Sequence, residues 1–545
     1  MAVLRSSLDT GSAEFAANAA AMRQKLAELD RLLAEAAAGG GAEATARHVS
    51  RGKLPIRERL ALLLDHDSPF LELSALAGAE TNYALGGGLL LGIGVVEETE
   101  CVILGNDPTV LGGAMTAVSY KKIERGLEVA RQNRLPYVQF VESAGGDLRG
   151  GGGRGVDPAE ELRRNMGHFA ETGSIFRQIT QLSAAGVPTI SVVFGSSTAG
   201  GAYQPGLSDY NIFVDKGAKV FLGGPPLVKM ATGEDSDDEE LGGAEMHARV
   251  SGLADYLAVD ERDGIRLARE VVGHLHWQKR GPGPSEPADD PLYDEEELLG
   301  LVSPDLRSFF DVREVIARVV DGSRFEEFKA SFGETLVCGF ASIHGFPVGV
   351  LGNNGVLFSD SSQKAAQFIQ LCNQISTPLC FLQNITGYMV GRQYERGGIV
   401  KHGSQMINAL SNSTVPHVTV ILGASYGAGN YGMGGRAFDT RFVFLWPSAK
   451  IAVMGPRQMA GVMSIVRRAR AARRGEELDE EAEQLRSRFV EDLAERQSLA
   501  LYATGRVSDD GVIDPRDTRH VIGMALSACD SNEVRGADGF GVFRL

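Results

Sequence analysis

The sequence predicts an α/β protein built from two copies of one domain. Short runs rich in β-branched residues, such as 189–194 and 418–422, alternate with Ala- and Leu-rich stretches of helical period, and a Gly-rich turn follows each run. At 545 residues the chain is too long for one ordinary hydrophobic core, so two large domains or a duplicated domain are expected. An internal repeat favours duplication.

The repeat covers the strand and turn that the two halves share. Residues 187–203 (VPTISVVFGSSTAGGAY) align without gaps on residues 415–431 (VPHVTVILGASYGAGNY) at an offset of 228, with seven of seventeen positions identical. Further along, Ala218-Lys-Val220 matches Ala449-Lys-Ile451 at an offset of 231. Upstream, residues 68–73 resemble residues 323–328. We therefore expect equivalent elements in both halves.

Composition shifts divide the chain into four segments. Residues 12–47 are rich in Ala, Glu and Leu and contain a Gly39-Gly-Gly41 break, so residues 1–47 are expected to form a helical extension. A Pro- and acid-rich stretch without periodicity begins near residue 280 and predicts a linker over 286–305. The two domains are then expected at 48–285 and 306–545.

Composition and charge exclude several classes. No apolar run reaches the roughly 20 residues that a membrane helix needs, and the N-terminus lacks the apolar core of a secretory signal. The net charge of −16 disfavours a nucleic-acid binder. The five cysteines are odd in number and form no C-x-x-C pair, which argues against a disulfide framework and a zinc ribbon. A cytoplasmic protein with reduced cysteines is expected.

Two short motifs in the second copy suggest other chemistries. Residues 427–432 fit the G-x-G-x-x-G pattern of dinucleotide sites, but the strand and acidic residue expected about 20 positions later are not clear. Residues 423–427 fit the G-x-S-x-G nucleophile elbow, which would make Ser425 the nucleophile of a serine hydrolase. The first copy keeps the serine, as Ser197, but has Ala199 where the second glycine of the elbow would stand.

The feature that both copies share is a run of small residues beside a helix start. Small residues let backbone N–H groups approach a ligand oxygen that becomes negative, whereas a larger side chain would hold the ligand away. Tight packing of helix on strand would also select small residues, but both loops carry the same pattern. No metal-binding spacing, P-loop or catalytic triad is evident. The sequence therefore predicts two oxyanion holes.

Several longer motifs, in order along the chain, resemble the carboxyltransferase (beta) subunits of biotin-dependent acyl-CoA carboxylases, and most of all 3-methylcrotonyl-CoA carboxylase. They are Arg51-Gly-Lys-Leu-Pro-Ile-Arg-Glu-Arg59, Asn353-Asn-Gly-Val-Leu-Phe358, Phe381-Leu-Gln-Asn-Ile-Thr-Gly387, Gly397-Gly-Ile-Val-Lys-His-Gly403 and the run from Gly423 to Gly432. The resemblance extends from about residue 48 to residue 530.

The resemblance implies two tandem crotonase-type domains, each a ββα superhelix, with every active site between the N-terminal domain of one subunit and the C-terminal domain of another. It implies that Ala199, Gly200 and Gly201 hold the thioester enolate oxygen, and that Ala428 and Gly429 hold the ureido oxygen of biotin. Tyr426 and Gly427 are expected beside the biotin, and Arg51 and Lys53 at the CoA phosphates. A solvated surface is the alternative for these two cations.

The expected reaction is transfer of a carboxyl group from carboxybiotin, carried by a biotin carboxylase and carrier alpha subunit, to a CoA thioester. The enolate and biotin loops would act without a metal. A methylcrotonyl-CoA-like substrate is favoured; propionyl-, geranyl- or longer-chain acyl-CoA substrates, a decarboxylase running the transfer backwards, and a non-catalytic scaffold remain alternatives. The chain lacks an Ala/Val-Met-Lys-Met biotin attachment element, and a homo-oligomer, plausibly a hexamer, is expected.

Two segments depart from the methylcrotonyl pattern. Asp147-Leu-Arg-Gly-Gly-Gly-Gly-Arg-Gly155 replaces a less glycine-rich loop that lies near the substrate in the family. Gly455-Pro-Arg-Gln-Met-Ala460 stands where a Gly-Glu-Gln-Ala-Ala-like run is usual. Both segments leave the acyl group open.

Overall fold

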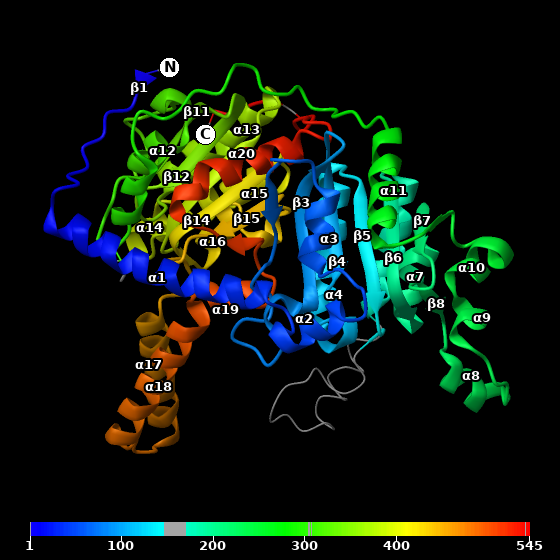
Figure 1. Cartoon of the computed structure of the whole chain (residues 1–545). Helices are drawn as coiled ribbons and strands as arrows, with labels where there is room; N and C mark the ends of the chain where they lie inside the picture. Colours follow the sequence, from blue (N-terminus) through cyan, green and yellow to red (C-terminus); the bar gives the residue numbers. More distant parts are fainter. Residues whose placement is uncertain (1, 147–170, 304–305, 307, 540, 545) are drawn as a thin grey trace.

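The protein folds around two mixed β-sheets that lie side by side, with helices packed over them (Figure 1). The computed structural model describes residues 2–146, 171–303, 306, 308–539 and 541–544. The glycine-rich segment Asp147–Gly155 lies outside these described residues. One hydrophobic core cluster contains side chains from both sheets, so the two halves share buried apolar surface.

The first sheet has the strand order β2-β3-β4-β5-β6-β7-β9, with β8 paired to β6. Its strands are β2 (Phe70–Glu72), β3 (Leu89–Val96), β4 (Thr99–Asn106), β5 (Tyr137–Ser143), β6 (Thr189–Thr198), β7 (Tyr210–Val214), β8 (Lys219–Phe221) and β9 (Tyr256–Ala258). β2, β3 and β4 pair antiparallel, and the remaining strands pair parallel.

The second sheet repeats this order as β10-β11-β12-β13-β14-β15-β17, with β16 paired to β14. Its strands are β10 (Arg324–Glu327), β11 (Leu336–Ile343), β12 (Phe346–Asn353), β13 (Leu379–Ile385), β14 (His417–Tyr426), β15 (Phe442–Leu445), β16 (Lys450–Ala452) and β17 (Gly511–Val512). A short N-terminal strand, β1 (Ala2–Val3), extends this sheet by pairing antiparallel with β10.

The register of the strands repeats as closely as their order. In both halves an antiparallel hairpin of two eight-residue strands is followed by parallel pairing. The ladder between the third and fourth strands of this series shifts at the same place, between Val141 and Ser143 in one half and between Gln383 and Ile385 in the other. The α/β fold from an internal duplication is thereby confirmed.

The helices follow the strands in the same sequence in both halves. After α1 (Ala13–Ala37) and α2 (Gly41–Val49), the described helices before residue 300 are α3 (Ile56–Leu63), α4 (Ala117–Asn133), α6 (Ser174–Ala184), α7 (Tyr203–Gly206), α8 (Pro225–Thr232), α9 (Asp238–Gly242), α10 (Ala244–Met246) and α11 (Glu261–His274). Those after it are α12 (Val312–Val319), α13 (Ser359–Gln374), α14 (Arg392–Arg396), α15 (Ile399–Ser411), α16 (Ala428–Gly432), α17 (Pro456–Arg474), α18 (Glu480–Ser498), α19 (Ala500–Thr504) and α20 (Thr518–Cys529).

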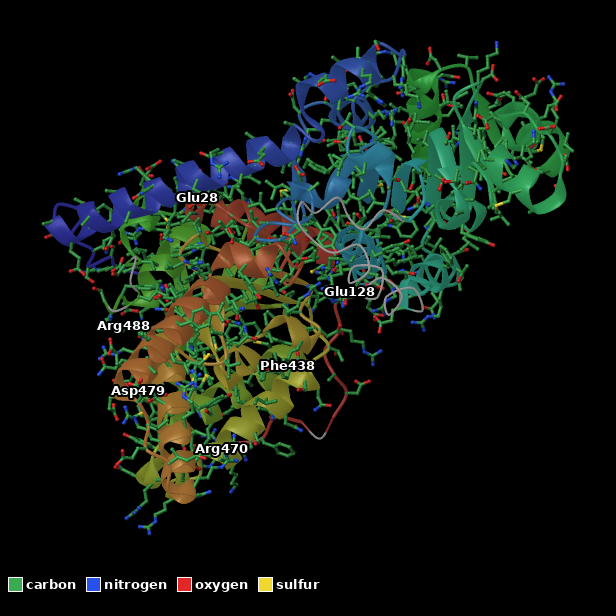
Figure 2. The ribbon with its side chains drawn as sticks, turned by 90° about the horizontal axis from the view of Figure 1, so that it is seen from below. Glu28, Glu128, Phe438, Arg470, Asp479 and Arg488 are labelled. Atoms are coloured by element: carbon green, nitrogen blue, oxygen red, sulfur yellow. The ribbon has the colours of Figure 1, made fainter. Side chains whose placement is uncertain are left out.

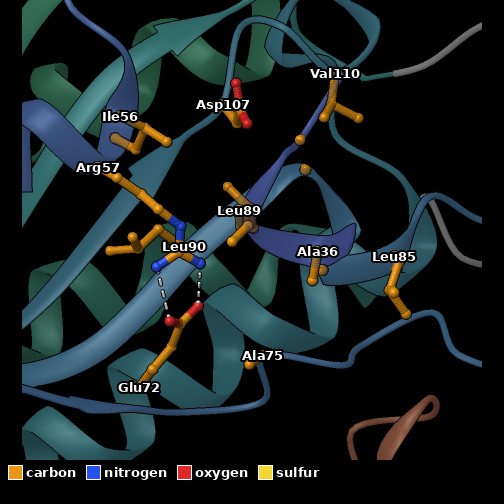
Figure 3. Close-up of a pocket in the computed structure, with 14 residues that line it drawn as sticks. Ala36, Ile56, Arg57, Glu72, Ala75, Leu85, Leu89, Leu90, Asp107 and Val110 are labelled. Carbon is orange, nitrogen blue, oxygen red and sulfur yellow. Dashed lines mark hydrogen bonds and ion pairs between the residues drawn. The ribbon is translucent and has the colours of Figure 1, made fainter. Parts of the chain in front are cut away.

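An ion pair is also duplicated. In Figure 3 the Arg57 guanidinium of α3 contacts the Glu72 carboxylate of β2 through two hydrogen bonds of 3.0 and 2.9 Å. Arg313 of α12 binds Glu327 of β10 in the same two-pronged way, at 2.8 and 2.5 Å. Each pair joins a helix to the first strand of its half with the planar fit that arginine and carboxylate favour.

The N-terminal segment lies against the second half. Ser12 caps α1 (Ala13–Ala37) by accepting a hydrogen bond from the backbone N–H of Phe15. The helix buries Ala19, Met22, Leu26 and Leu29, whose spacing forms one stripe. Asn18 donates to the carbonyl of Gly300, at the end of the 3-10 helix η5 (Glu295–Gly300). Residues 295–300, inside the predicted linker, are therefore packed structure.

Candidate active site

The two small-residue loops follow equivalent strands and have related backbones. β6 ends at Thr198 and leads into the 3-10 turn η3 (Ala199–Ala202) and α7, whereas β14 ends at Tyr426 and leads through Gly427 into α16. Ala199 has φ of 51° and Gly427, its aligned counterpart, has φ of 57°. The first N–H groups of such turns lack intrahelical partners, so both loops offer backbone donors.

The duplicated glycines stand where no side chain fits easily. A Cβ on Gly201 would lie 3.2 Å from Ser197 Oγ and 3.4 Å from Ser143 Cβ. A Cβ on Gly429 would lie 2.6 Å from Ile385 Cγ1, a much closer approach. Gly201 and Gly429 are buried, whereas Ala199 and Ala428 are exposed and Gly200 is partly buried. Space therefore requires glycine at position 429 and disfavours a side chain at position 201.

A second loop lies against each turn. Gly145, just after β5, lies close enough to the first turn that its Cβ would be 3.0 Å from the Thr198 carbonyl oxygen. In the second half Gly387, just after β13, has its Cα 3.2 Å from where a Gly429 Cβ would be. The sequence reasoning assigned no role to these two glycines, although Gly387 ends one of the motifs that carry the family resemblance.

Gly427 needs the freedom of glycine, and Tyr426 borders it. Gly427 combines φ of 57° with ψ of −146°, a conformation essentially restricted to glycine, and its N–H donates to the Ala452 carbonyl at 2.9 Å. Tyr426 is almost buried, and this burial raises the pKa of its hydroxyl to about 12. The hydroxyl therefore remains a neutral donor at physiological pH.

Ser425 is held inside the protein by two side chains. Its hydroxyl donates to Gln383 Oε1 at 2.6 Å and accepts from Asn430 Nδ2 at 2.8 Å. Ser425 is 0% exposed, and both its partners are amides and not a histidine. A nucleophile elbow requires an exposed hydroxyl beside a general base. The arrangement supports a loop-stabilising role and gives no support to the hydrolase reading.

Lys53 lies in a buried network of charges behind β6. Its ammonium contacts the Glu142 carboxylate and donates to the Phe194 carbonyl oxygen at 3.1 Å. Arg59, fully buried, binds Glu142 at 2.9 Å and Glu261 at 2.8 Å. Burial alone would raise the pKa of Glu142, but the charges of Arg59 and Lys53 hold it below its ordinary value.

This network gives different roles to Arg51 and Lys53, the two cations that are predicted to bind the CoA phosphates. Arg51 is exposed, whereas the Lys53 side chain is 23% exposed and already paired. Arg51 is therefore the one of the two whose charge is available to a ligand on the surface. Lys53 is positioned to brace the segment that carries Arg51, because it ties that segment to β5 and β6.

Within the part of the chain that the structure describes, no three His, Cys, Asp or Glu side chains gather as a metal-binding group. Among those same residues, no helix combines the length and the apolar character needed to cross a bilayer.

Comparisons with known proteins agree with the family resemblance of the sequence motifs. The family described as "Carboxyl transferase domain" matches residues 47–541. A probable biotin-dependent acyl-coenzyme A carboxylase beta2 subunit from Mycobacterium tuberculosis is 55% identical, with 100% of each chain covered. A probable mitochondrial methylcrotonoyl-CoA carboxylase beta chain from Drosophila melanogaster is 46% identical, covering 100% of this chain and 95% of the relative. The solved beta subunit of P. aeruginosa geranyl-CoA carboxylase is 43% identical with a TM-score of 0.88, and each chain is covered completely.

Proposed function

The chain belongs to the carboxyl transferase family, and from that membership we propose that it transfers a carboxyl group from carboxybiotin to an acyl-CoA or enoyl-CoA thioester. The observation that carries the proposal is the duplicated loop: Gly201 and Gly429 occupy aligned positions, and a Cβ would be crowded at Gly201 (3.2 Å from Ser197 Oγ) and would clash at Gly429 (2.6 Å from Ile385 Cγ1). The loop that contains Gly201 and the loop that contains Gly429 would each provide one of the two oxyanion sites that the reaction needs.

The residues present fit the groups that they would hold. Because the Gly427 N–H is already bonded to the Ala452 carbonyl, the N–H groups that would donate to the ureido oxygen are those of Ala428 and Gly429 at the start of α16. When bound, carboxybiotin would release CO2 as its bond from nitrogen to the carboxyl group breaks; that nitrogen would then take the proton that the substrate loses, and the enolate so formed would bond to the CO2. The loop from Ala199 to Gly201 would orient the thioester carbonyl and stabilise charge on its oxygen. Positioning and charge stabilisation then account for the catalysis, without a side-chain base.

We infer that the favoured substrate is methylcrotonyl-CoA or a close analogue. A relative whose name specifies methylcrotonoyl-CoA is 46% identical, whereas the geranyl-CoA carboxylase subunit is 43% identical, so the identities separate these substrates only weakly. Propionyl- and longer-chain acyl-CoA remain the alternatives. Carboxylation of a panel of CoA thioesters, by the chain reconstituted with a biotinylated alpha subunit, tests both function and substrate. Failure with every thioester in a complete complex would refute the proposal.

Two partners are proposed. The first is an alpha subunit that carries biotin carboxylase and the biotinylated domain, because the nearest match to an attachment element here, Val228-Lys-Met230, lacks the preceding Met. A positive streptavidin blot of the purified chain would contradict this. The second is further copies of this chain, assembled as a hexamer: α7 and α16, which follow the two loops, lie well apart in one chain (Figure 1), so a site that uses both needs two chains.

A reducing compartment such as the cytoplasm is proposed for the protein. All five cysteines are buried and unpaired, as expected where thiols stay reduced.

A further inference from the structure

A basic pocket lies between the two halves of the chain, on the side seen from below in Figure 2, where Glu128 is labelled. The cavity has a volume of about 620 Å³, within the range of small-molecule sites. α4 and α6 form one wall, and Arg436 and residues 506–508 of the second half form the other. Its charged lining residues are Lys121, Arg125, Arg131, Arg177, Arg436 and Arg506, with Glu124 and Glu128.

The charge of the pocket opposes the charge of the protein. Six lining residues are cations and two are carboxylates, whereas the whole chain carries a net charge of −16. Within the described residues, Lys121, Arg131 and Arg177 have no ion pair or hydrogen bond through their charged ends. Unpaired cations gathered in a concave site concentrate a positive field there.

The other cations are already held in place. Arg506 donates to the Tyr502 carbonyl at 2.8 Å, and its guanidinium lies 3.4 Å above the Tyr502 ring. Arg436 spans Glu128 and Asp510 at 3.2 and 3.4 Å. Hydrogen bonds of this length are weak, so the guanidinium N–H groups of Arg436 can still donate to a ligand. Arginines that are fixed before binding lose little side-chain entropy when an anion arrives.

The basic face of α4 is not an ordinary solvated helix face. Its charged residues recur every three or four positions and so line one side of the helix. That side faces the second half, because Arg125 is 4% exposed and binds the Asp510 carboxylate at 2.6 Å. The second half therefore encloses Arg125, whereas Lys121 and Arg131 on the same side of the helix remain exposed to solvent and to salt screening.

We propose that this pocket binds a small molecule that carries a diphosphate group, at a site separate from the two oxyanion loops. Paired guanidinium groups match phosphate oxygens in geometry and charge. α4 begins two residues after Met115, which bonds to Gly145 beside the first loop; along this helix the pocket extends from Lys121, about 6 Å from Ala117, to Arg131, about 21 Å from it. The ligand would contact both halves and so stabilise their packing.

Calorimetric titration of the full chain with inorganic pyrophosphate, at low ionic strength, tests the proposal. We expect binding that weakens as KCl is added, that raises the melting temperature, and that persists in saturating CoA. The double variant Arg131→Gln, Arg177→Gln should bind at least about tenfold more weakly, because each change removes a charge-assisted contact. Both side chains are exposed and unpaired, so folding should be unaffected.

Arg262→Gln, which changes an exposed arginine of α11, is the matched control and should bind as the parent does. Wild-type affinity in the double variant, absence of binding in the parent, or displacement of pyrophosphate by CoA would each overturn the proposal. The titration requires no turnover, so its failure would leave the carboxyltransferase function untouched.

Discussion

Lys122 and Lys364 occupy the same position in the two halves, three residues after the serines that cap α4 and α13, and both are 0% exposed. The Lys122 ammonium donates to the carbonyl oxygens of Gly86 and Leu89 at 3.2 and 2.7 Å. Burial lowers the pKa of Lys122 to about 8 and lowers the pKa of Lys364. A buried lysine has thus persisted in both copies at a cost in solvation.

The lowered pKa of Lys122 predicts a pH-dependent stability. Because the folded state favours the neutral amine, it holds fewer protons than the unfolded state between pH 8 and 10.5, so stability should rise with pH through that window. Lys122→Met should reduce this rise by up to about 3 kcal/mol. Chemical denaturation at pH 7.5 and pH 10 measures it, with exposed Lys121→Met as control. An unchanged pH slope in Lys122→Met would contradict the prediction.

Because the backbone of Ala199 is strained, we expect that its replacement by glycine does not destabilise the protein. Ala199 has φ of 51°, which glycine adopts without strain, so Ala199→Gly should leave stability unchanged or raise it by up to about 1 kcal/mol. Ala202→Gly, at φ of −64°, should instead destabilise the protein by about 0.5–1 kcal/mol through backbone entropy alone. The melting temperatures of the two variants distinguish these cases. If both variants lost the same stability, the backbone of Ala199 would not be strained.

The sequence predicted what depends on local pattern, and missed what depends on distant contacts. The repeat at residues 187–203 and 415–431 located both loops, because glycine spacing after a strand is a local signal. No local pattern marks Lys122 as a buried residue, and its burial follows only from its contacts with the carbonyl oxygens of Gly86 and Leu89. Likewise, no local pattern relates Lys53 to Glu142, 89 positions apart. Contacts of this kind form only when segments distant in the sequence meet in the folded chain.

Ser425 predicts a loss of stability that exceeds the loss of activity. Ser425→Ala removes two buried hydrogen bonds and leaves Gln383 and Asn430 short of a partner, which should cost about 1–3 kcal/mol. Most of the carboxyltransferase rate should remain in the folded oligomer, and a fluorophosphonate should not label the parent. Abolished turnover in a stable, correctly assembled Ser425→Ala protein would reopen the hydrolase hypothesis.

The two loop glycines predict losses that differ in kind. Gly201→Val should impair handling of the CoA substrate, and Gly429→Val should impair handling of carboxybiotin, because each side chain would fill a different oxyanion loop. Loss of one oxyanion donor typically lowers the rate by about 10²–10³-fold. Gly429→Ala should already be severe, since its Cβ would lie 2.6 Å from Ile385, whereas Gly201→Ala, with its closest contact at 3.2 Å, should be milder.

Kinetics of the reconstituted complex separate the two effects. With free biotin as acceptor in the reverse reaction, Gly429→Val should lose turnover selectively, while Gly201→Val should show its defect in the dependence on CoA thioester. Gly206→Ala is the matched control, because Gly206 lies at the end of α7 near the first loop and a Cβ there meets nothing within 4 Å. If both valine variants assembled and turned over normally, the oxyanion assignment of the loops would be wrong, whatever the family membership of the chain.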